Sequence, residues 1–330
     1  MVNDTLQAAI QEALGEQYVI ERELPRGGMS RVFVATESAL RRRVVIKVLS
    51  PELAATLSTE RFKREIALAA RLQHPHLVPL LSAGLAGDYL YYTMPMVDGE
   101  SLRERMNRER PMAIASVIGI IDDVARALAY AHDEGVVHRD IKPENVMFFH
   151  DQAVVLDFGI GKALISASTA ETETLRITQA GMSLGTPTYV APEQASGDPA
   201  LDHRADLYAL GVVAYEMLTG HPPFGGRSPQ VVMEAHAKRK PDPIEGRRPD
   251  VPPHLSQVVM RCLAKLPDDR PQSGHDIVRG LDPATATTAT SGASRAGGWA
   301  KAPLWIPWAL FGLSTLVAIL LGVLYAARAR

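Results

Sequence analysis

The chain has 330 residues, 46% of them hydrophobic, which is enough for one large two-lobed domain or for two ordinary domains with additional segments. Lys and Arg total 35 against 37 Asp and Glu, and a balance this even argues against nucleic acid as a partner. The single cysteine, Cys262, cannot form an internal disulfide, and the N-terminus lacks the basic region and apolar run of a signal peptide, so the folded part is expected in a reducing compartment.

The N-terminal third is predicted to be a short helix followed by strands. Leu6, Ile10 and Leu14 recur at helical spacing within residues 1–17, which predicts an amphipathic helix that covers the next region. Strand-like runs then alternate with Gly, Pro or charged turns, a pattern typical of an antiparallel sheet. The predicted strands are 18–23, 32–36 and 44–49.

Two polar residues stand out in and after these strands. Lys47 follows the apolar run 44–46, where a solvated strand end is the alternative to a ligand-binding role. Glu65 lies on a predicted helix over 60–72 and is placed to pair with Lys47. Farther along, 89–97 is strand-like, whereas 102–106 and 114–133 have helical periodicity, so the second half of the chain is predicted to be mainly helical.

The segment 137–145, Val-His-Arg-Asp-Ile-Lys-Pro-Glu-Asn, has the composition of a catalytic loop. Asp140, Lys142 and Asn145 offer a carboxylate, an ammonium and a carboxamide within six residues. Such a set can hold a hydroxyl nucleophile, a phosphate and a metal ion together, as phosphoryl transfer requires. The alternative is a chance polar turn between two helices.

Three further segments follow in an order that fits the same chemistry. A short strand over 153–156 ends in Asp157-Phe158-Gly159, where the aspartate can turn its carboxylate toward Mg²⁺. Residues 166–183 are polar and have no apolar period, which predicts a loop. Residues 185–193 read Gly-Thr-Pro-Thr-Tyr-Val-Ala-Pro-Glu.

Residues 18–281 resemble the protein kinase family, and most of all the bacterial membrane-anchored, eukaryotic-like (Hanks-type) serine/threonine protein kinases. The resemblance implies an α+β, two-lobed protein kinase fold, with an antiparallel sheet plus one helix in the N-lobe (18–97) and a mainly helical C-lobe (98–282). It further implies a non-specific serine/threonine protein kinase that transfers the γ-phosphoryl group of ATP to protein Ser or Thr hydroxyls, with Mg²⁺ or also Mn²⁺ as the metal. Protein substrates and a homodimer that phosphorylates itself in trans are the partners it implies.

The resemblance also implies roles for single residues. Asp140 accepts the proton of the attacking hydroxyl, Lys142 steadies the transferring group, and Asn145 and Asp157 bind the metal. The residues implied in ATP binding are Lys47, Glu65, Gly27, Gly28, Val32, Val45, Met94, Met96, Val97 and Met147. The residues implied in structural or regulatory roles are Arg139, Phe158, Gly159, Thr186, Glu193, Asp206 and Arg270.

Among the latter, Glu193 is expected to pair with Arg270, and Asp206 to brace the catalytic loop from below. Arg139 is expected to clasp a phosphate on the loop 166–183, which would order it. Thr178 is the first candidate phosphosite, followed by Thr172, Thr174 and Ser183.

The chain departs from the kinase pattern at three positions. Pro25 and Ser30 replace two glycines of the glycine-rich loop, and Val45 replaces an alanine. A pseudokinase that serves as a membrane-tethered scaffold is therefore one alternative. A small-molecule phosphotransferase of related fold is another, although 185–193 fits the docking of an extended peptide.

The C-terminal region is predicted to anchor the chain in a membrane. Residues 283–303 have linker composition, and 304–327 follow without a single charged residue. As a helix that stretch would be about 36 Å long, enough for a hydrocarbon core of roughly 30 Å. Trp305, Trp308 and Tyr325 near its ends suit the two interfaces. We therefore expect a single-pass protein of the cytoplasmic membrane with its kinase domain in the cytoplasm and a tail of residues 328–330.

Overall fold

The computed structural model describes residues 2–24, 30–49, 59–87, 89–158, 187–198, 200–226 and 228–283. The chain divides after Asp282, and all elements described here belong to the compact unit Met1–Asp282. Gly27, Gly28, Gly159, Thr186, the four candidate phosphosites and the predicted membrane span 304–327 lie outside the described residues.

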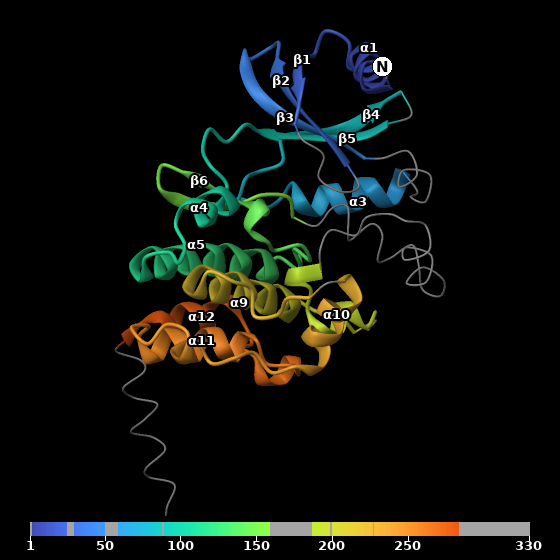
Figure 1. Ribbon diagram of the computed structural model, residues 1–330. Coiled ribbons are helices and arrows are strands. Elements are labelled where there is room, and N and C mark those ends of the chain that lie inside the picture. The colour runs from blue at the N-terminus through green and yellow to red at the C-terminus, as the bar shows by residue number, and fades with distance from the viewer. Residues whose placement is uncertain are drawn as a thin grey trace, which may run out of the picture. The chain divides into compact units, whose positions relative to one another are not determined.

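The first part of this unit is a five-stranded antiparallel sheet in the order β1-β2-β3-β5-β4 (Figure 1). Apart from β4, its strands contain β-branched and aromatic residues, which suit a pleated surface with both faces covered. The strands are β1 (Tyr18–Glu23), β2 (Ser30–Glu37), β3 (Arg42–Leu49), β4 (Ser82–Ala86) and β5 (Tyr89–Pro95).

A helix covers each face of the sheet. Helix α1 (Val2–Leu14) buries Ile10 and Leu14 in a cluster with the β-strand residues Phe33, Ile46 and Tyr91. Helix α3 (Thr59–Ala69) buries its apolar side against the opposite face, in a cluster that includes Leu90, Tyr92 and Met94. Because side chains alternate along β5, Tyr91 and Tyr92 serve different cores.

The second part of the unit is mainly helical, with its helices stacked below the sheet in the view of Figure 1. Helices α5 and α9 are buried along most of their length, since a core of Leu, Val, Ile and Ala side chains surrounds them. The helices are α4 (Leu102–Arg108), α5 (Ile114–Asp133), α8 (Pro192–Ala195), α9 (Arg204–Thr219), α10 (Pro229–Lys238), α11 (Pro253–Cys262) and α12 (Gly274–Leu281). The 3₁₀ turns among the described residues are η1 (Pro143–Asn145), η2 (Pro187–Tyr189), η3 (Ile244–Gly246) and η4 (Pro267–Asp269).

A small hairpin positions the chemistry. Strands β6 (Val146–Phe149) and β7 (Gln152–Val155) pair antiparallel, and His150 and Asp151 form the turn with φ angles of 48° and 62°. Val146 is opposite Val155, so the residues just outside the hairpin, Asn145 and Leu156, meet at its open end. The hairpin therefore brings the segment before it next to the segment after it.

The structure tests several element predictions. The two-lobed kinase fold is confirmed, and β1 and α5 have the bounds predicted from the pattern. Strand β4 was not predicted, because Ser-Ala-Gly-Leu-Ala contains no β-branched or aromatic residue. No helix among the described residues has both the length and the hydropathy needed to cross a bilayer.

Candidate active site

The loop before β6 is held from below by one buried carboxylate. Asp206, 1% exposed in the first turn of α9, accepts the backbone N–H groups of His138 (2.8 Å) and Arg139 (2.7 Å). His132 of α5 also donates Nε2–H to it at 2.9 Å. Burial alone would raise the pKa of Asp206, but the hydrogen bond from His132 and the backbone N–H of His138 outweigh burial and lower it. The expected bracing by Asp206 is present in the structure.

His138 links this loop to the segment after β7. The N–H of Asp140 donates to Nδ1 of His138 at 3.1 Å, so Nε2 bears the proton and donates to the Leu156 carbonyl at 2.8 Å. Burial lowers the pKa of His138 and favours this neutral form. Phe158 packs edge-on against the same ring, with ring centroids 4.8 Å apart. The backbones that lead to Asp140 and Asp157 are therefore joined through one side chain.

Asp140, Lys142 and Asn145 form a compact polar group. Lys142 Nζ donates to Asp140 Oδ2 at 2.7 Å, and Asn145 Nδ2 donates to the same oxygen at 3.1 Å and to the Asp140 carbonyl at 2.8 Å. Because the amide of Asn145 uses its nitrogen for these contacts, its oxygen is left as a ligand atom. The backbone carbonyl of Asn145 accepts the N–H of Leu156 at 2.8 Å. This bond holds Asn145 close to Asp157, the residue that follows Leu156.

The carboxylate of Asp157 reaches the sheet. Lys47 Nζ, on β3, donates to Asp157 Oδ2 at 2.6 Å, and the Tyr92 hydroxyl, on β5, donates to Oδ1 at 3.2 Å. Asp157 has a φ of 55°, in the left-handed region, and this turn aims its side chain at Lys47. The N-lobe lysine and the predicted metal ligand thus lie in one cleft.

The expected ion pair between Lys47 and Glu65 is not made in this structure. Glu65 lies on the same side of α3 as the buried residues Phe62, Ile66 and Ala69, as expected for a helix residue that faces the sheet. Lys47 pairs with Asp157 instead, and their side chains are 19% and 17% exposed. The ammonium of Lys47 is partly withdrawn from water and is stabilised by a carboxylate nearby. The backbone turn at Asp157 brings that carboxylate to it.

Val32, Val45 and Met94, which were predicted to take part in ATP binding, lie on the same face of the sheet as Lys47. The register Val32–Lys47–Tyr92 runs across β2, β3 and β5, and the next row on the same face includes Val45 and Met94. After β5, the N–H of Met96 donates to the Arg43 carbonyl at 3.3 Å, so it is already engaged. Val97 is buried, and Met147 lies half-buried in β6.

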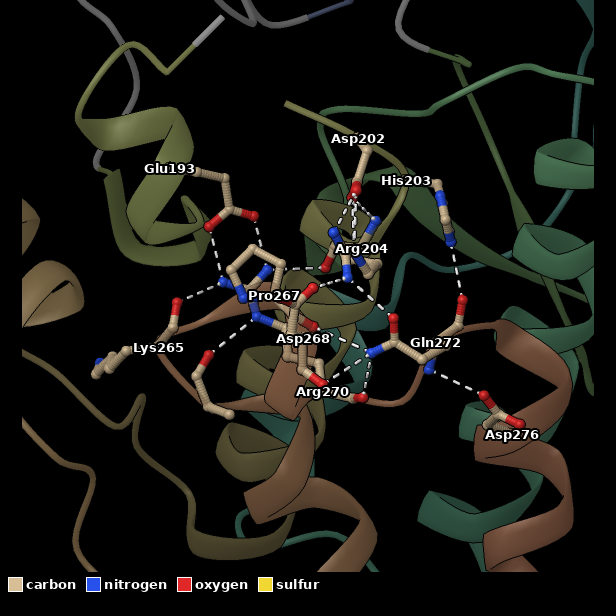
Figure 2. A network of polar contacts seen from close by, with 11 residues as sticks. Glu193, Asp202, His203, Arg204, Lys265, Pro267, Asp268, Arg270, Gln272 and Asp276 are labelled. Atoms are coloured by element: carbon tan, nitrogen blue, oxygen red, sulfur yellow. Dashed lines mark hydrogen bonds and ion pairs between the residues drawn. The ribbon is translucent and has the colours of Figure 1, made fainter. Parts of the chain in front are cut away.

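The expected pair of Glu193 and Arg270 is formed, and it is bidentate (Figure 2). The two guanidinium nitrogens of Arg270 lie 2.6 and 2.7 Å from the Glu193 oxygens, and Arg270 also donates to the carbonyls of Ala264, Arg204 and Lys265. Arg270 is fully buried. This network ties the segment around α8 to the turn η4.

A second network, which the sequence analysis missed, connects the catalytic loop to η2. Arg103 of α4 donates to Glu144 at 2.8 Å and to Glu216 at 2.9 Å, and the Tyr189 hydroxyl donates to Glu216 at 2.5 Å. An arginine at the start of a helix gives no local signal of such a role. Tyr92 was also missed, because a tyrosine inside a strand gives no local signal of a role in the site. It lies two residues before Met94, and both side chains are on the same face of β5.

Two further observations complete the site. Arg139 has a φ of 65°, and its Nε is buried without a hydrogen-bond partner among the described residues. No group of three or more His, Cys, Asp or Glu side chains with the spacing of a metal site occurs in the part of the chain that the structure describes.

Comparisons with known proteins agree with this geometry. The family model for the protein kinase domain matches residues 18–279. The chain is 41% identical over 270 residues to the serine/threonine-protein kinase PknB of Mycolicibacterium smegmatis, which covers 80% of this chain and 42% of that protein. It is also 41% identical over 271 residues to the serine/threonine-protein kinase pkn3 of Myxococcus xanthus, which covers 79% of this chain and 49% of that protein.

A solved structure shows the same fold at lower identity. The crystal structure of Rad53 1-466 in complex with AMP-PNP matches with a TM-score of 0.65 and 21% identity, and the match covers 84% of this chain and 68% of that one. The chain spans less than half the length of the two curated relatives named above. From the match of the family model and these identities, the chain belongs to the protein kinase domain family.

Proposed function

We propose that the chain is a serine/threonine protein kinase that transfers the γ-phosphoryl group of ATP to a protein hydroxyl. The observation that supports this most directly is the convergence of three segments: Lys47 from the sheet, Asp140 with Asn145 from the loop before β6, and Asp157 from the segment after β7. The names of the relatives support the serine/threonine class. Lys142, two residues after Asp140, is typical of that class.

The residues divide the work as follows. Asp140 is held by Lys142 and Asn145 and receives the proton of the substrate hydroxyl. Lys142, bound to the same carboxylate, places positive charge where charge develops on the transferred group. Lys47 binds the α- and β-phosphates of the nucleotide, which requires it to leave Asp157 and lets it pair with Glu65. Catalysis is then mostly positioning and electrostatics.

Asn145 and Asp157 would hold a divalent cation, and both fit that role. The amide oxygen of Asn145 is the hard ligand atom that Mg²⁺ prefers, and the carboxylate of Asp157 already holds the ammonium of Lys47 at 2.6 Å. Bound Mg²⁺ supplies neutralisation of charge on the phosphate oxygens.

The test is transfer of labelled phosphate from ATP by the full chain to itself and to a mixture of protein substrates, followed by mapping of modified residues by mass spectrometry. Phosphoserine or phosphothreonine that disappears with Asp140→Asn supports the proposal. ATP binding without turnover would favour the pseudokinase alternative, and phosphate on a metabolite but never on protein would favour the small-molecule phosphotransferase.

We further propose that residues 304–327 anchor the chain in the cytoplasmic membrane. We also propose that a homodimer phosphorylates the loop 166–183 in trans and that Arg139 binds the resulting phosphate. The 24 uncharged residues of the span support the anchor. The buried Nε of Arg139, which has no partner among the described residues, supports the binding of a phosphate. Membrane fractionation of the chain with Val317→Arg tests the anchor, since a charge at mid-span opposes insertion. Release of the variant into the soluble fraction is expected.

A further inference from the structure

The buried hydroxyl of Tyr92 is the unusual feature of this site. It donates to Asp157 Oδ1 at 3.2 Å, while Lys47 donates to Oδ2 at 2.6 Å. Within the described residues these are the two side chains that donate to the predicted metal ligand. Tyr92 is only 4% exposed, so its hydroxyl has been withdrawn from water in order to make this contact.

The sheet holds Tyr92 rigidly. Lys47 and Tyr92 are cross-strand partners of β3 and β5, so both side chains leave the same face of the sheet and reach the same carboxylate. The ring of Tyr92 belongs to the cluster that α3 forms with the sheet, alongside Phe62, Ile66 and Leu90. Its hydroxyl is therefore placed by packing and not by the ligand it contacts.

Asp157 has room to move if it is not held. Its backbone has a φ of 55°, in the left-handed region that few residues other than glycine, asparagine and aspartate adopt. A cavity of about 30 Å³ lies beside it, lined by Tyr92, Asp157 and Phe158 together with apolar residues that include Leu72. A carboxylate that lost its donors could turn into this space.

The two donors differ in what the proposed reaction asks of them. Lys47 must turn to the nucleotide phosphates, whereas Tyr92 has no other task. Its hydroxyl is buried and donates to Asp157 Oδ1, and this contact does not depend on the nucleotide.

We propose that Tyr92 is a positioning residue: its hydroxyl keeps the Asp157 carboxylate turned into the cleft when Lys47 leaves, and so sets the affinity of the site for the divalent cation. This inference rests on the proposed function, since it assumes that Asp157 is a metal ligand. No sequence motif marks this role of Tyr92, because an apolar side chain of similar size would fill the same place in the core.

The test is the affinity of the full chain for Mg²⁺ when it is saturated with the ATP analogue AMP-PNP, measured by titration calorimetry. We expect Tyr92→Phe to raise the dissociation constant of Mg²⁺ about tenfold, because hydrogen bonds to charged groups are among the stronger ones. The apparent KM for Mg²⁺ should rise in parallel, with kcat at saturating Mg²⁺ lowered less than threefold.

Tyr91→Phe is the matched control. Tyr91 is the preceding residue of the same strand and is also buried, but it packs on the opposite face, edge-on to Tyr18 with ring centroids 6.5 Å apart. The Tyr91→Phe variant should keep the Mg²⁺ affinity within about twofold of wild type, because it loses a tyrosine hydroxyl that is remote from Asp157.

A double-mutant cycle separates positioning from packing. In an Asp157→Ala background, which removes the acceptor of the Tyr92 hydroxyl, Tyr92→Phe should cause no further change in Mg²⁺ affinity. Unchanged or tighter Mg²⁺ binding by Tyr92→Phe, or an equal loss in the Asp157→Ala background, overturns the inference. If Tyr92→Phe fails to fold, Tyr92→Met is measured in the same way, with the same expected result. Because the readout is binding, it stands even if no protein substrate is ever phosphorylated.

Discussion

Among the described residues, several buried or partly buried charges are paired across segments that lie far apart in the sequence. Lys47 and Asp157 are 110 residues apart, and Glu193 and Arg270 are 77 residues apart. Such pairs add little net stability over apolar packing, but breaking one leaves a buried charge without a partner. They therefore fix which segments meet, and a substitution of one partner should be costly.

Arg270→Met tests this at the most buried pair. It removes a fully buried cation and leaves Glu193 and three backbone carbonyls without their donor, so we expect the free energy of unfolding to fall by about 3–5 kcal/mol. Urea denaturation measures it. Lys238→Gln breaks an exposed pair with Glu234 and should cost about 0.5 kcal/mol or less. Equal losses in the two variants would show that burial does not govern the value of these pairs.

His236 should make the stability depend on pH. Burial, with the nearby charge of Lys265, lowers the pKa of His236 to about 4, against about 6.5 in an unfolded chain. Between these values the unfolded state binds a proton that the folded state does not, so the free energy of unfolding should fall as the pH drops from about 6.5 toward 4. The full effect is about 3 kcal/mol. Denaturation of wild type and His236→Gln across this range measures it, and parallel curves would contradict the assignment.

At the scale of elements, the sheet depends on helix α1. Ile10 is fully buried in the cluster on one face of the sheet, and Gln11 donates to the Tyr18 carbonyl and accepts from the N–H of Ile20. The helix is thus packed and hydrogen-bonded to β1, as its amphipathic pattern indicated.

Ile10→Ala should therefore lower the free energy of unfolding by about 2–5 kcal/mol, because it leaves a cavity in this cluster. Glu12→Gln, at an exposed position of the same helix, should change it by less than about 0.5 kcal/mol. A loss below about 1 kcal/mol for Ile10→Ala would mean that α1 is not part of the folded core.

Local patterns predicted the elements better than the contacts between them. The apolar periods of β1 and α5 lie within single segments, so both were found with their bounds. The expected partner of Lys47, Glu65, is not its partner in this structure, because Asp157 offers a second carboxylate and its left-handed turn brings that carboxylate to Lys47. The roles of Tyr92 and Arg103 depend on packing between distant segments, which no local pattern encodes.

On the scale of the whole unit, chemistry lies where the sheet and the helical part meet. The sheet contributes Lys47 and Tyr92, and the hairpin β6-β7 brings Asn145 next to the segment that holds Asp157. Asp206 and His138 then fix these segments against α9 and α5.

The most direct test of the central claim is the rate of γ-phosphoryl transfer from MgATP to protein Ser or Thr by wild type, Asp140→Asn and Asp157→Asn. We expect wild type to transfer phosphate and both variants to lose at least about a thousandfold in rate, because one loses the acceptor of the hydroxyl proton and the other a metal ligand. Nucleotide binding without metal should persist in both. Transfer by either variant at the wild-type rate would contradict the account.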